Sequence, residues 1–151
     1  YSLASSVIRN GRRLIAVASG FKTKNDRSRQ SLKLLMWGFS NFDTIKIAKK
    51  NEPVVELEVW LGKQETVPGY VANDIYKTIK KARKKDLKVI AEYNGPIKAP
   101  ITKDQKLGIL KIYFKDQLLD EQKIYASIDV KKLNLIASLV KSINYLIWGD
   151  V

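Results

Sequence analysis

A seven-residue stretch near the end of the chain, SLVKSIN from Ser138 to Asn144, combines residue types that can carry out acyl transfer. It contains an S-x-x-K and an S-x-N, the spacings at which some serine enzymes place a nucleophile, its lysine and a substrate-binding pair. In such sites the two motifs come from separate segments that meet across a cleft. Here both fall on one predicted helix, where Ser142 and Asn144 point in different directions. We therefore interpret the match as a coincidence.

The remaining chain offers little other catalytic chemistry. A second S-x-x-K, Ser19 to Lys22, follows a predicted strand, and no K-[ST]-G occurs. The absence of cysteine and histidine excludes disulfides, thiolate chemistry, His-based triads and the usual zinc sites. Lys98 lies in a turn-rich stretch that is faintly similar to lipoyl and biotinyl carrier domains, but the Met neighbours usual in biotinyl domains are missing. We expect no cofactor and no metal.

Charge is the strongest compositional signal. The 151 residues include 28 Lys and Arg against 15 Asp and Glu, a net charge of +13, which predicts attraction to polyanions. The densest run is KTIKKARKKDLK, Lys77 to Lys88, which is either a solvated hairpin without a partner or a polyanion contact. No aromatic residues that would stack on bases alternate with its cations, so nucleic acid is not the expected partner.

The first 43 residues predict a β-hairpin followed by a helix. Asn10-Gly11 separates two β-prone runs and is the strongest short signal for a two-residue turn. After Gly20 the apolar spacing changes to that of a helix, which Asn25 or Asp26 can cap and Gly38 can end. A hairpin and one helix cannot close a core, so we expect apolar surface to be left exposed and the piece to belong to a longer protein.

Residues 44–130 predict a small antiparallel β-sandwich, so the fold class is mainly β. Short apolar runs recur about every ten residues and are separated by turn residues, among them Pro68-Gly69. Val55, Leu57 and Val59 alternate with glutamates, which indicates a strand with one wet face. The predicted strands are TIKIA, VVELEVW, IYKTI, LKVIAEY, KLGILKIYF and LLDEQKIYA.

Residues 131–151 predict an amphipathic helix that lies on a membrane surface. Large aliphatic residues recur on one stripe, lysines can attract anionic lipid, and Trp148 suits the headgroup region. The generic alternative is a helix that packs on the sandwich or pairs with a second copy. The predicted membrane-binding residues are Lys132, Ile136, Leu139, Val140, Lys141, Ile143, Ile147 and Trp148.

Taken in order, YSLASSVIRNGRRLIAVASG, SLKLLMWGFSNF, VVELEVWLG, GPIKAPITKDQKLGIL and the terminal helix resemble the C-terminal part of low-molecular-weight penicillin-binding proteins. These are serine D-alanyl-D-alanine carboxypeptidases of bacterial cell-wall metabolism. The resemblance implies three parts: the end of the catalytic domain at 1–43, the family's C-terminal β domain at 44–130 and its membrane anchor at 131–151. It also implies a place at the periplasmic face of the cytoplasmic membrane.

The resemblance carries only one site residue onto this chain. In the family the S-x-x-K, S-x-N and K-T-G precede the point that corresponds to Tyr1, so we expect this chain to be inactive alone. Arg27 matches an arginine that helps to hold the substrate's terminal carboxylate, a role suited to a planar fork of donors. Peptidoglycan peptides would therefore be reached only through the missing catalytic domain. An exposed arginine without a ligand is the alternative for Arg27.

Three functions follow as hypotheses. The first is a non-catalytic segment that acts as spacer and membrane anchor of a carboxypeptidase in peptidoglycan maturation. The second is a basic nucleic-acid-binding β domain, which rests on charge alone. The third is a self-sufficient acyl-serine enzyme, which rests on SLVKSIN. We favour the first, and the sequence does not predict an oligomeric state.

Overall fold

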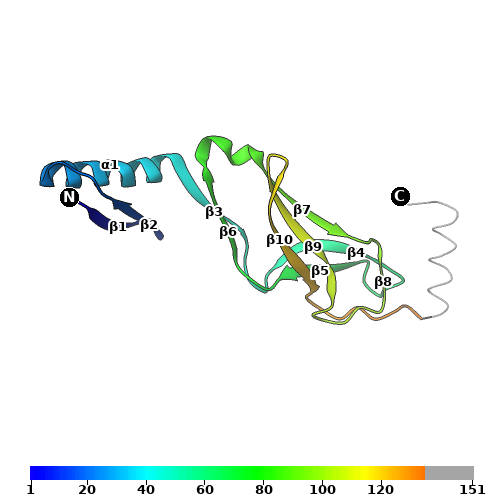
Figure 1. The fold of residues 1–151 in the computed structure, drawn as a ribbon. Coiled ribbons are helices and arrows are strands. Elements are labelled where there is room, and N and C mark those ends of the chain that lie inside the picture. Colours follow the sequence, from blue (N-terminus) through cyan, green and yellow to red (C-terminus); the bar gives the residue numbers. More distant parts are fainter. Residues whose placement is uncertain (135–151) are drawn as a thin grey trace. The chain divides into compact units, whose positions relative to one another are not determined.

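A computed structural model describes residues 1–134, which divide into two compact units (Figure 1). The first unit contains residues 1–46 and 76–85, and the second contains residues 47–75 and those from 86 onward. Strands β3 (Phe42–Ala48) and β6 (Ile75–Lys80) pair with each other. The chain passes from one unit to the other inside these two strands.

The first unit begins with the predicted hairpin, which the structure confirms. Strands β1 (Leu3–Arg9) and β2 (Arg12–Ala18) are antiparallel, and Arg9 lies opposite Arg12 at the turn. Asn10 and Gly11 have φ values of 50° and 74°, the left-handed conformation that a two-residue hairpin turn needs.

Helix α1 (Lys24–Asn41) follows, but both predicted ends were wrong. Thr23 is the N-cap, because its hydroxyl accepts the Asp26 N–H at 3.0 Å. Gly38 does not end the helix, which continues for one more turn. The C-cap is Phe42, and its N–H donates to the Gly38 carbonyl. A Cβ on Gly38 would lie 2.9 Å from Leu14 Cδ1, so the glycine allows the helix to approach β2.

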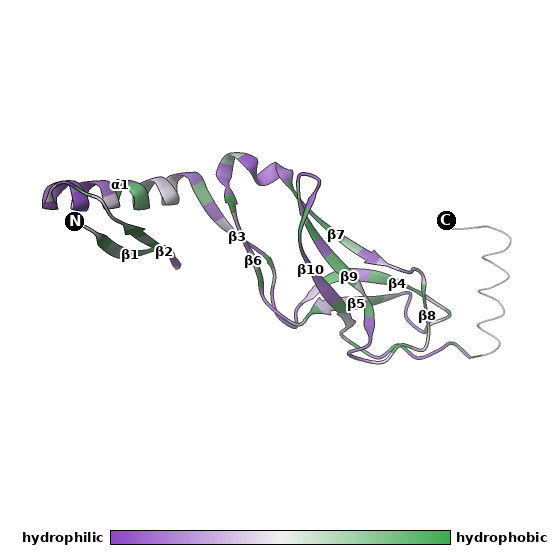
Figure 2. Ribbon diagram, in the orientation of Figure 1, coloured by the Kyte–Doolittle hydropathy of each residue, from purple (hydrophilic) through white to green (hydrophobic). Residues whose placement is uncertain are grey.

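The first unit buries few apolar side chains, as the sequence predicted. Ala16, Leu35 and Ile79 are buried, whereas most large apolar residues of the hairpin and helix are exposed. Ile15 and Val17 on β2 are 69% and 76% exposed. Figure 2 shows this apolar character along β1 and β2. The exposed set comprises Val7, Ile8, Ile15, Val17, Leu32, Leu34, Met36 and Trp37.

The second unit is built on a six-stranded sheet in the order β7-β9-β10-β5-β4-β8. Neighbouring strands are antiparallel except β4 and β8, which pair in parallel through Val59 with Ile97 and Trp60 with Lys98. The mainly β, antiparallel prediction is therefore confirmed. The bounds are β4 (Pro53–Trp60), β5 (Thr66–Val71), β7 (Leu87–Tyr93), β8 (Ile97–Lys98), β9 (Lys106–Phe114) and β10 (Gln117–Ala126).

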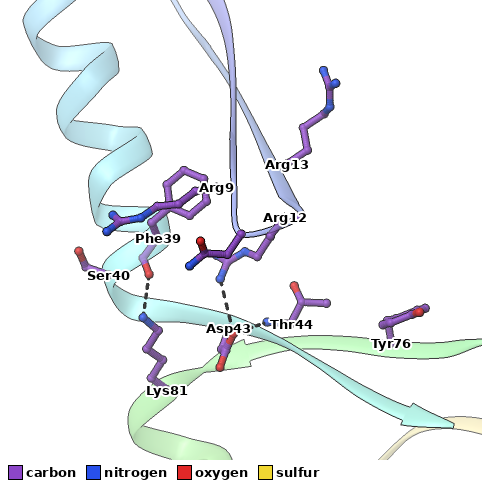
Figure 3. A pocket seen from close by; sticks show the side chains of 11 residues that line it. Arg9, Arg12, Arg13, Phe39, Ser40, Asp43, Thr44, Tyr76 and Lys81 are labelled. Atoms are coloured by element: carbon purple, nitrogen blue, oxygen red, sulfur yellow. Dashed lines mark hydrogen bonds and ion pairs between the residues drawn. The ribbon is translucent and has the colours of Figure 1, made fainter.

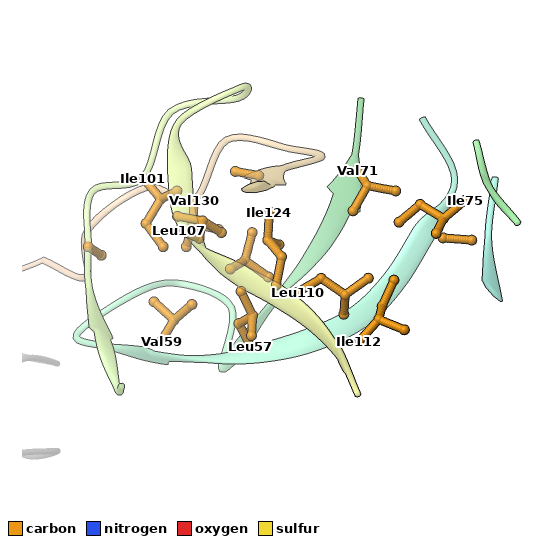
Figure 4. Close-up of a cluster of buried hydrophobic side chains, with 14 residues drawn as sticks. Leu57, Val59, Val71, Ile75, Ile101, Leu107, Leu110, Ile112, Ile124 and Val130 are labelled. Carbon is orange, nitrogen blue, oxygen red and sulfur yellow. The ribbon is translucent and has the colours of Figure 1, made fainter. Parts of the chain in front are cut away.

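One hydrophobic core holds the second unit together (Figure 4). Leu57 and Val59 enter it from β4 while Glu56 and Glu58 stay exposed, as the alternation predicts. Ile112 on β9 and Ile124 on β10 are fully buried. Ile101 and Val130, which form an isolated β-bridge with each other, are fully buried as well. Side chains from β4, on one edge of β5, and from β9 and β10, on its other edge, thus belong to one apolar core.

Two turn predictions in this region were wrong. Pro68-Gly69 lies inside β5, where Pro68 faces Glu56 of β4 and Gly69 faces Ala126 of β10. Lys77–Lys88 is not a hairpin, because β6 pairs with β3 and β7 pairs with β9. A 3-10 helix, η1 (Lys81–Asp86), connects β6 to β7 instead.

The last described residues run along the second unit. Lys132 bridges Gly62, and Val130 bridges Ile101. The Lys63 N–H donates to the Lys131 carbonyl at 2.8 Å, and the Leu133 N–H donates to Leu61 at 2.9 Å. Residues 131–133 therefore extend the β structure and do not begin the predicted helix.

Candidate functional site

The one carried-over site residue, Arg27, lies in the first turn of α1. Its N–H donates to the carbonyl of the N-cap Thr23 at 3.1 Å. Arg27, Ser31 and Leu35 follow at four-residue spacing and so share one helix face. The Arg27 Nε and the Ser31 hydroxyl are both buried without a hydrogen-bond partner among the described residues. Arg27 is thus less exposed than a solvated arginine, and its carboxylate-binding role stays a prediction.

A second feature of the first unit is a hollow of about 830 Å³ beside the hairpin turn (Figure 3). The turn residues, the end of α1, the start of β3 and the β6–η1 junction contribute to it. Its lining combines cations, hydroxyl groups and two aromatic rings. The lining residues are Arg9, Asn10, Gly11, Arg12, Arg13, Phe39, Ser40, Asp43, Thr44, Tyr76 and Lys81.

Arg12 fixes the geometry of this hollow. Its Nη1 donates to the Phe42 carbonyl at 2.5 Å, and its Nη2 donates to the Gly38 carbonyl at 3.0 Å. The guanidinium carbon lies 5.3 Å from the centre of the Phe39 ring, a cation–π distance. These contacts satisfy carbonyls at the end of the helix and attach the hairpin turn to it. Arg12 is therefore a structural residue of the hollow.

Asp43 is the single acid in the lining, and cations surround it. Lys84 Nζ lies 2.7 Å from one carboxylate oxygen, and Arg12 Nη1 lies 3.9 Å from the other. The hydrogen bond from Lys84 holds the pKa of Asp43 below its ordinary value, although desolvation acts in the opposite direction. Because Asp43 is engaged in this way, it offsets little of the positive charge of the hollow.

Two further cations remain available to a ligand. The Lys81 ammonium donates to the Phe39 carbonyl at 2.9 Å, and its other two N–H donors have no hydrogen-bond partner among residues 1–134. Arg9 is exposed, and its guanidinium has no hydrogen bond or ion pair among residues 1–134. In the view of Figure 3, Arg9 extends toward the end of α1, whereas Arg13 extends away from Asp43. Arg13 is bound to the Ser6 hydroxyl at 3.2 Å.

Sequence reasoning missed this hollow, although a signal was present. The run RNGRR places a cation on each side of a two-residue turn, and such flanking residues face each other across a hairpin. The basic run that the sequence singled out supplies Lys81 and Lys84. That the run lies close to the hairpin turn is a tertiary fact without a local sequence pattern.

The remaining predicted site residues divide into two groups. Lys132 is described and forms the bridge to Gly62. Ile136, Leu139, Val140, Lys141, Ile143, Ile147 and Trp148 lie outside the described residues, as does the SLVKSIN stretch. Within residues 1–134, no helix is long and apolar enough to span a membrane, and no three acidic residues gather as metal ligands would.

The fold and these sites can now be compared with known proteins. A family model described as "Penicillin-binding protein 5, C-terminal domain" matches residues 42–132, more than half of the chain. The chain belongs to this family. The resemblance read from the sequence is thereby confirmed, and the second unit is the part of the chain that carries most of the match.

Relatives with a longer chain extend the similarity to nearly all residues. D-alanyl-D-alanine carboxypeptidase DacF of Bacillus subtilis is 32% identical over 143 residues, which cover 94% of this chain and 37% of that protein. DacA of Escherichia coli is 27% identical over 147 residues, which cover 97% and 36%. A crystal structure of penicillin-binding protein 5 from Haemophilus influenzae superposes with a TM-score of 0.63 at 29% identity, covering 87% and 39%. The chain thus spans little more than a third of these proteins.

Proposed function

We propose that this chain is the non-catalytic C-terminal segment of a D-alanyl-D-alanine carboxypeptidase that acts in peptidoglycan maturation. The observation that carries the proposal is the extent of the match. DacF and DacA align with 94% and 97% of this chain but with only 37% and 36% of their own lengths. The activity of the whole protein would then reside in the part that this sequence does not contain.

The first unit supports this assignment. Its hairpin and helix expose many large apolar residues and bury only a few, so it lacks a closed core of its own. Such a surface fits a piece of a larger α/β domain. In the complete domain, Arg27 would help to hold the substrate's terminal carboxylate, and its Nε has no partner within residues 1–134.

The second unit and the C-terminal residues supply the proposed spacer and anchor. The second unit has its own core, so it can hold its shape between two attachments. The residues after 134 alternate aliphatic and polar side chains at helical spacing, and they follow Lys131 and Lys132. We propose that they bind the anionic outer face of the cytoplasmic membrane.

Flotation with liposomes tests the anchor. In the 151-residue chain, Ile136→Glu with Ile143→Glu should abolish binding to vesicles that contain phosphatidylglycerol, because burial of the aliphatic stripe outweighs charge attraction. Neutralisation of Lys131, Lys132 and Lys141 to Gln should only weaken it. The β-sheet spectrum should persist in both variants. A double glutamate variant that still floats, or a wild-type chain that never binds, would refute the anchor.

Two further measurements separate the alternatives. A fluorescent β-lactam should not label the chain, since an acylated Ser138 would mean a self-sufficient serine enzyme. Nucleic-acid binding, if it occurs, should be weak and lost at physiological salt. Saturable submicromolar binding to nucleic acid at that salt would favour the charge-based alternative over the carboxypeptidase segment.

A further inference from the structure

We propose that the hollow beside the hairpin turn is a binding site for a phosphate group, a function separate from the spacer and anchor roles. Four lining side chains are cationic: Arg9, Arg12, Arg13 and Lys81. Asp43 is the single acidic residue of the lining. Four positive charges and one negative charge leave an excess of three. An anion with more than one charge would relieve this concentration of like charge.

The lining cations differ in how many of their N–H donors are already hydrogen-bonded, and this difference identifies the residues that would contact the anion. Both terminal nitrogens of Arg12 are committed to backbone carbonyls, so Arg12 positions the turn and contributes its field. Arg9 has a whole guanidinium available, and Lys81 has two ammonium protons beyond the one that it gives to Phe39. Arg9 and Lys81 are therefore the residues that would bind the anion directly.

The uncharged groups in the lining favour phosphate over a simple carboxylate. Asn10 and Ser40 bring neutral polar groups to the same hollow as the two contact cations, whereas the Thr44 hydroxyl is already hydrogen-bonded to the Thr78 hydroxyl at 2.9 Å. Phosphate presents three or more acceptor oxygens and up to two charges, so it can use an arginine fork, an ammonium and hydroxyl donors at once. A monovalent carboxylate has two oxygens and one charge, and it would leave most of these donors without a partner.

The adjacent basic run would raise the local anion concentration. Lys80, Arg83, Lys84 and Lys85 belong to the same compact unit as the hollow and lie at or next to η1. Lys84 also neutralises Asp43, the group that would otherwise repel an anion. This arrangement gives the Lys77–Lys88 cluster a role beyond that of a solvated surface, and it predicts binding that weakens as salt increases.

Titration of the ¹⁵N-labelled 151-residue chain with pyrophosphate tests the site. We expect saturable amide shifts at Asn10, Gly11, Ser40 and Thr44. The variant Arg9→Gln with Lys81→Gln should bind about tenfold or more weakly, because two charge-assisted contacts are removed. The charge-matched control Lys33→Gln with Lys103→Gln, at exposed positions outside the hollow, should bind as the wild type does. Lys81→Arg, which keeps the charge, should retain binding.

Two probes then identify the chemistry and the source of the anion. Acetate at equal ionic strength should give no saturable shift at these amides. Phosphatidylglycerol vesicles that displace pyrophosphate would assign the site to a lipid phosphodiester, and vesicles that do not displace it would assign it to a soluble phosphate; both results support a phosphate site. Equal saturation by acetate, equal loss of affinity in the Lys33 and Lys103 control, or no saturation by pyrophosphate would overturn it.

Discussion

Arg12 shows how a single residue organises the end of a helix. Its two terminal nitrogens bind the carbonyls of Gly38 and Phe42, and its guanidinium lies over Phe39. A lysine could not replace it, because an ammonium lacks the planar fork that reaches two carbonyls in fixed directions. The hairpin turn and the end of α1 are thus joined through one side chain.

At the same scale, the ion pair between Lys84 and Asp43 gives a prediction about pH. The pKa of Asp43 is held low chiefly by the hydrogen bond from Lys84, so Lys84→Gln should raise it toward the usual value of an aspartate. A depressed pKa stabilises the fold above the ordinary pKa, and the stabilisation is lost as pH falls through the depressed value. The variant should therefore be less stable than the wild type near neutral pH and should lose less stability as the pH falls. An NMR titration that follows the Asp43 carboxyl carbon measures the pKa.

Lys33→Gln is the matched control for that titration. It removes one positive charge from an exposed position on α1 and leaves the contacts of Asp43 intact. The pKa of Asp43 should remain depressed in this variant. An equal rise in both variants would mean that the net charge of the chain, and not the hydrogen bond, sets the Asp43 pKa.

Among the elements, β5 contains a glycine at a position of close packing. A Cβ on Gly69 would lie 2.5 Å from Ile124 Cγ2 and 3.2 Å from Val55 Cγ1. Gly69→Ala should therefore lower the free energy of unfolding by about 1–3 kcal/mol, the usual cost of overpacking. Urea denaturation followed by circular dichroism measures the change.

A second variant tests whether this contact is the cause. Leucine lacks the Cγ2 methyl of isoleucine, so adding Ile124→Leu to Gly69→Ala should recover part of the lost stability, and the two effects should not add. Additive losses would show that Gly69 matters for its backbone and not for the space that it leaves to Ile124.

The elements also show which parts of the fold the sequence could predict. The hairpin at Asn10-Gly11, helix α1 and most strands of the second unit follow from local turn chemistry and apolar spacing. Strand β5 was missed because Pro68-Gly69 has the composition of a turn. Pro68 is tolerated where the pairing with β10 ends, and Gly69 is required by Ile124, a residue more than fifty positions away.

The same limit applies to the functional residues. The position of Arg27 in the first turn of α1 could be predicted, since it depends on the helix alone. The hollow could not, because β1–β2, α1 and η1 are separated by many residues and meet only in the tertiary structure. For the same reason the strand that pairs with the first part of Lys77–Lys88 could not be predicted, because β6 pairs with β3, which precedes it by about thirty residues.

At the scale of the whole molecule, the two units should differ in stability. The hydrophobic core lies within the second unit, whereas the first buries few apolar side chains. Hydrogen exchange of the full chain should therefore show slow amides in β4, β5, β9 and β10 and faster amides in β1, β2 and α1. Ile112→Ala, which opens a cavity at a fully buried site, should accelerate exchange in the second unit.

Leu118→Ala provides the comparison, because Leu118 is 44% exposed and its truncation creates no cavity. It should leave the slow amides of the second unit nearly unchanged. Equal protection of both units in the wild-type chain would contradict the difference inferred from burial.

The bridges at residues 130–133 also determine how the molecule responds to mechanical load. Val130 pairs with Ile101, Lys131 is hydrogen-bonded to Lys63 and Leu133 to Leu61, so the backbone is attached to the second unit as far as Leu133. A pull on the residues that follow Leu133 is transmitted through its hydrogen bond with Leu61 to the segment after β4. If a membrane holds the residues after 134, a force on them reaches the second unit at Leu133.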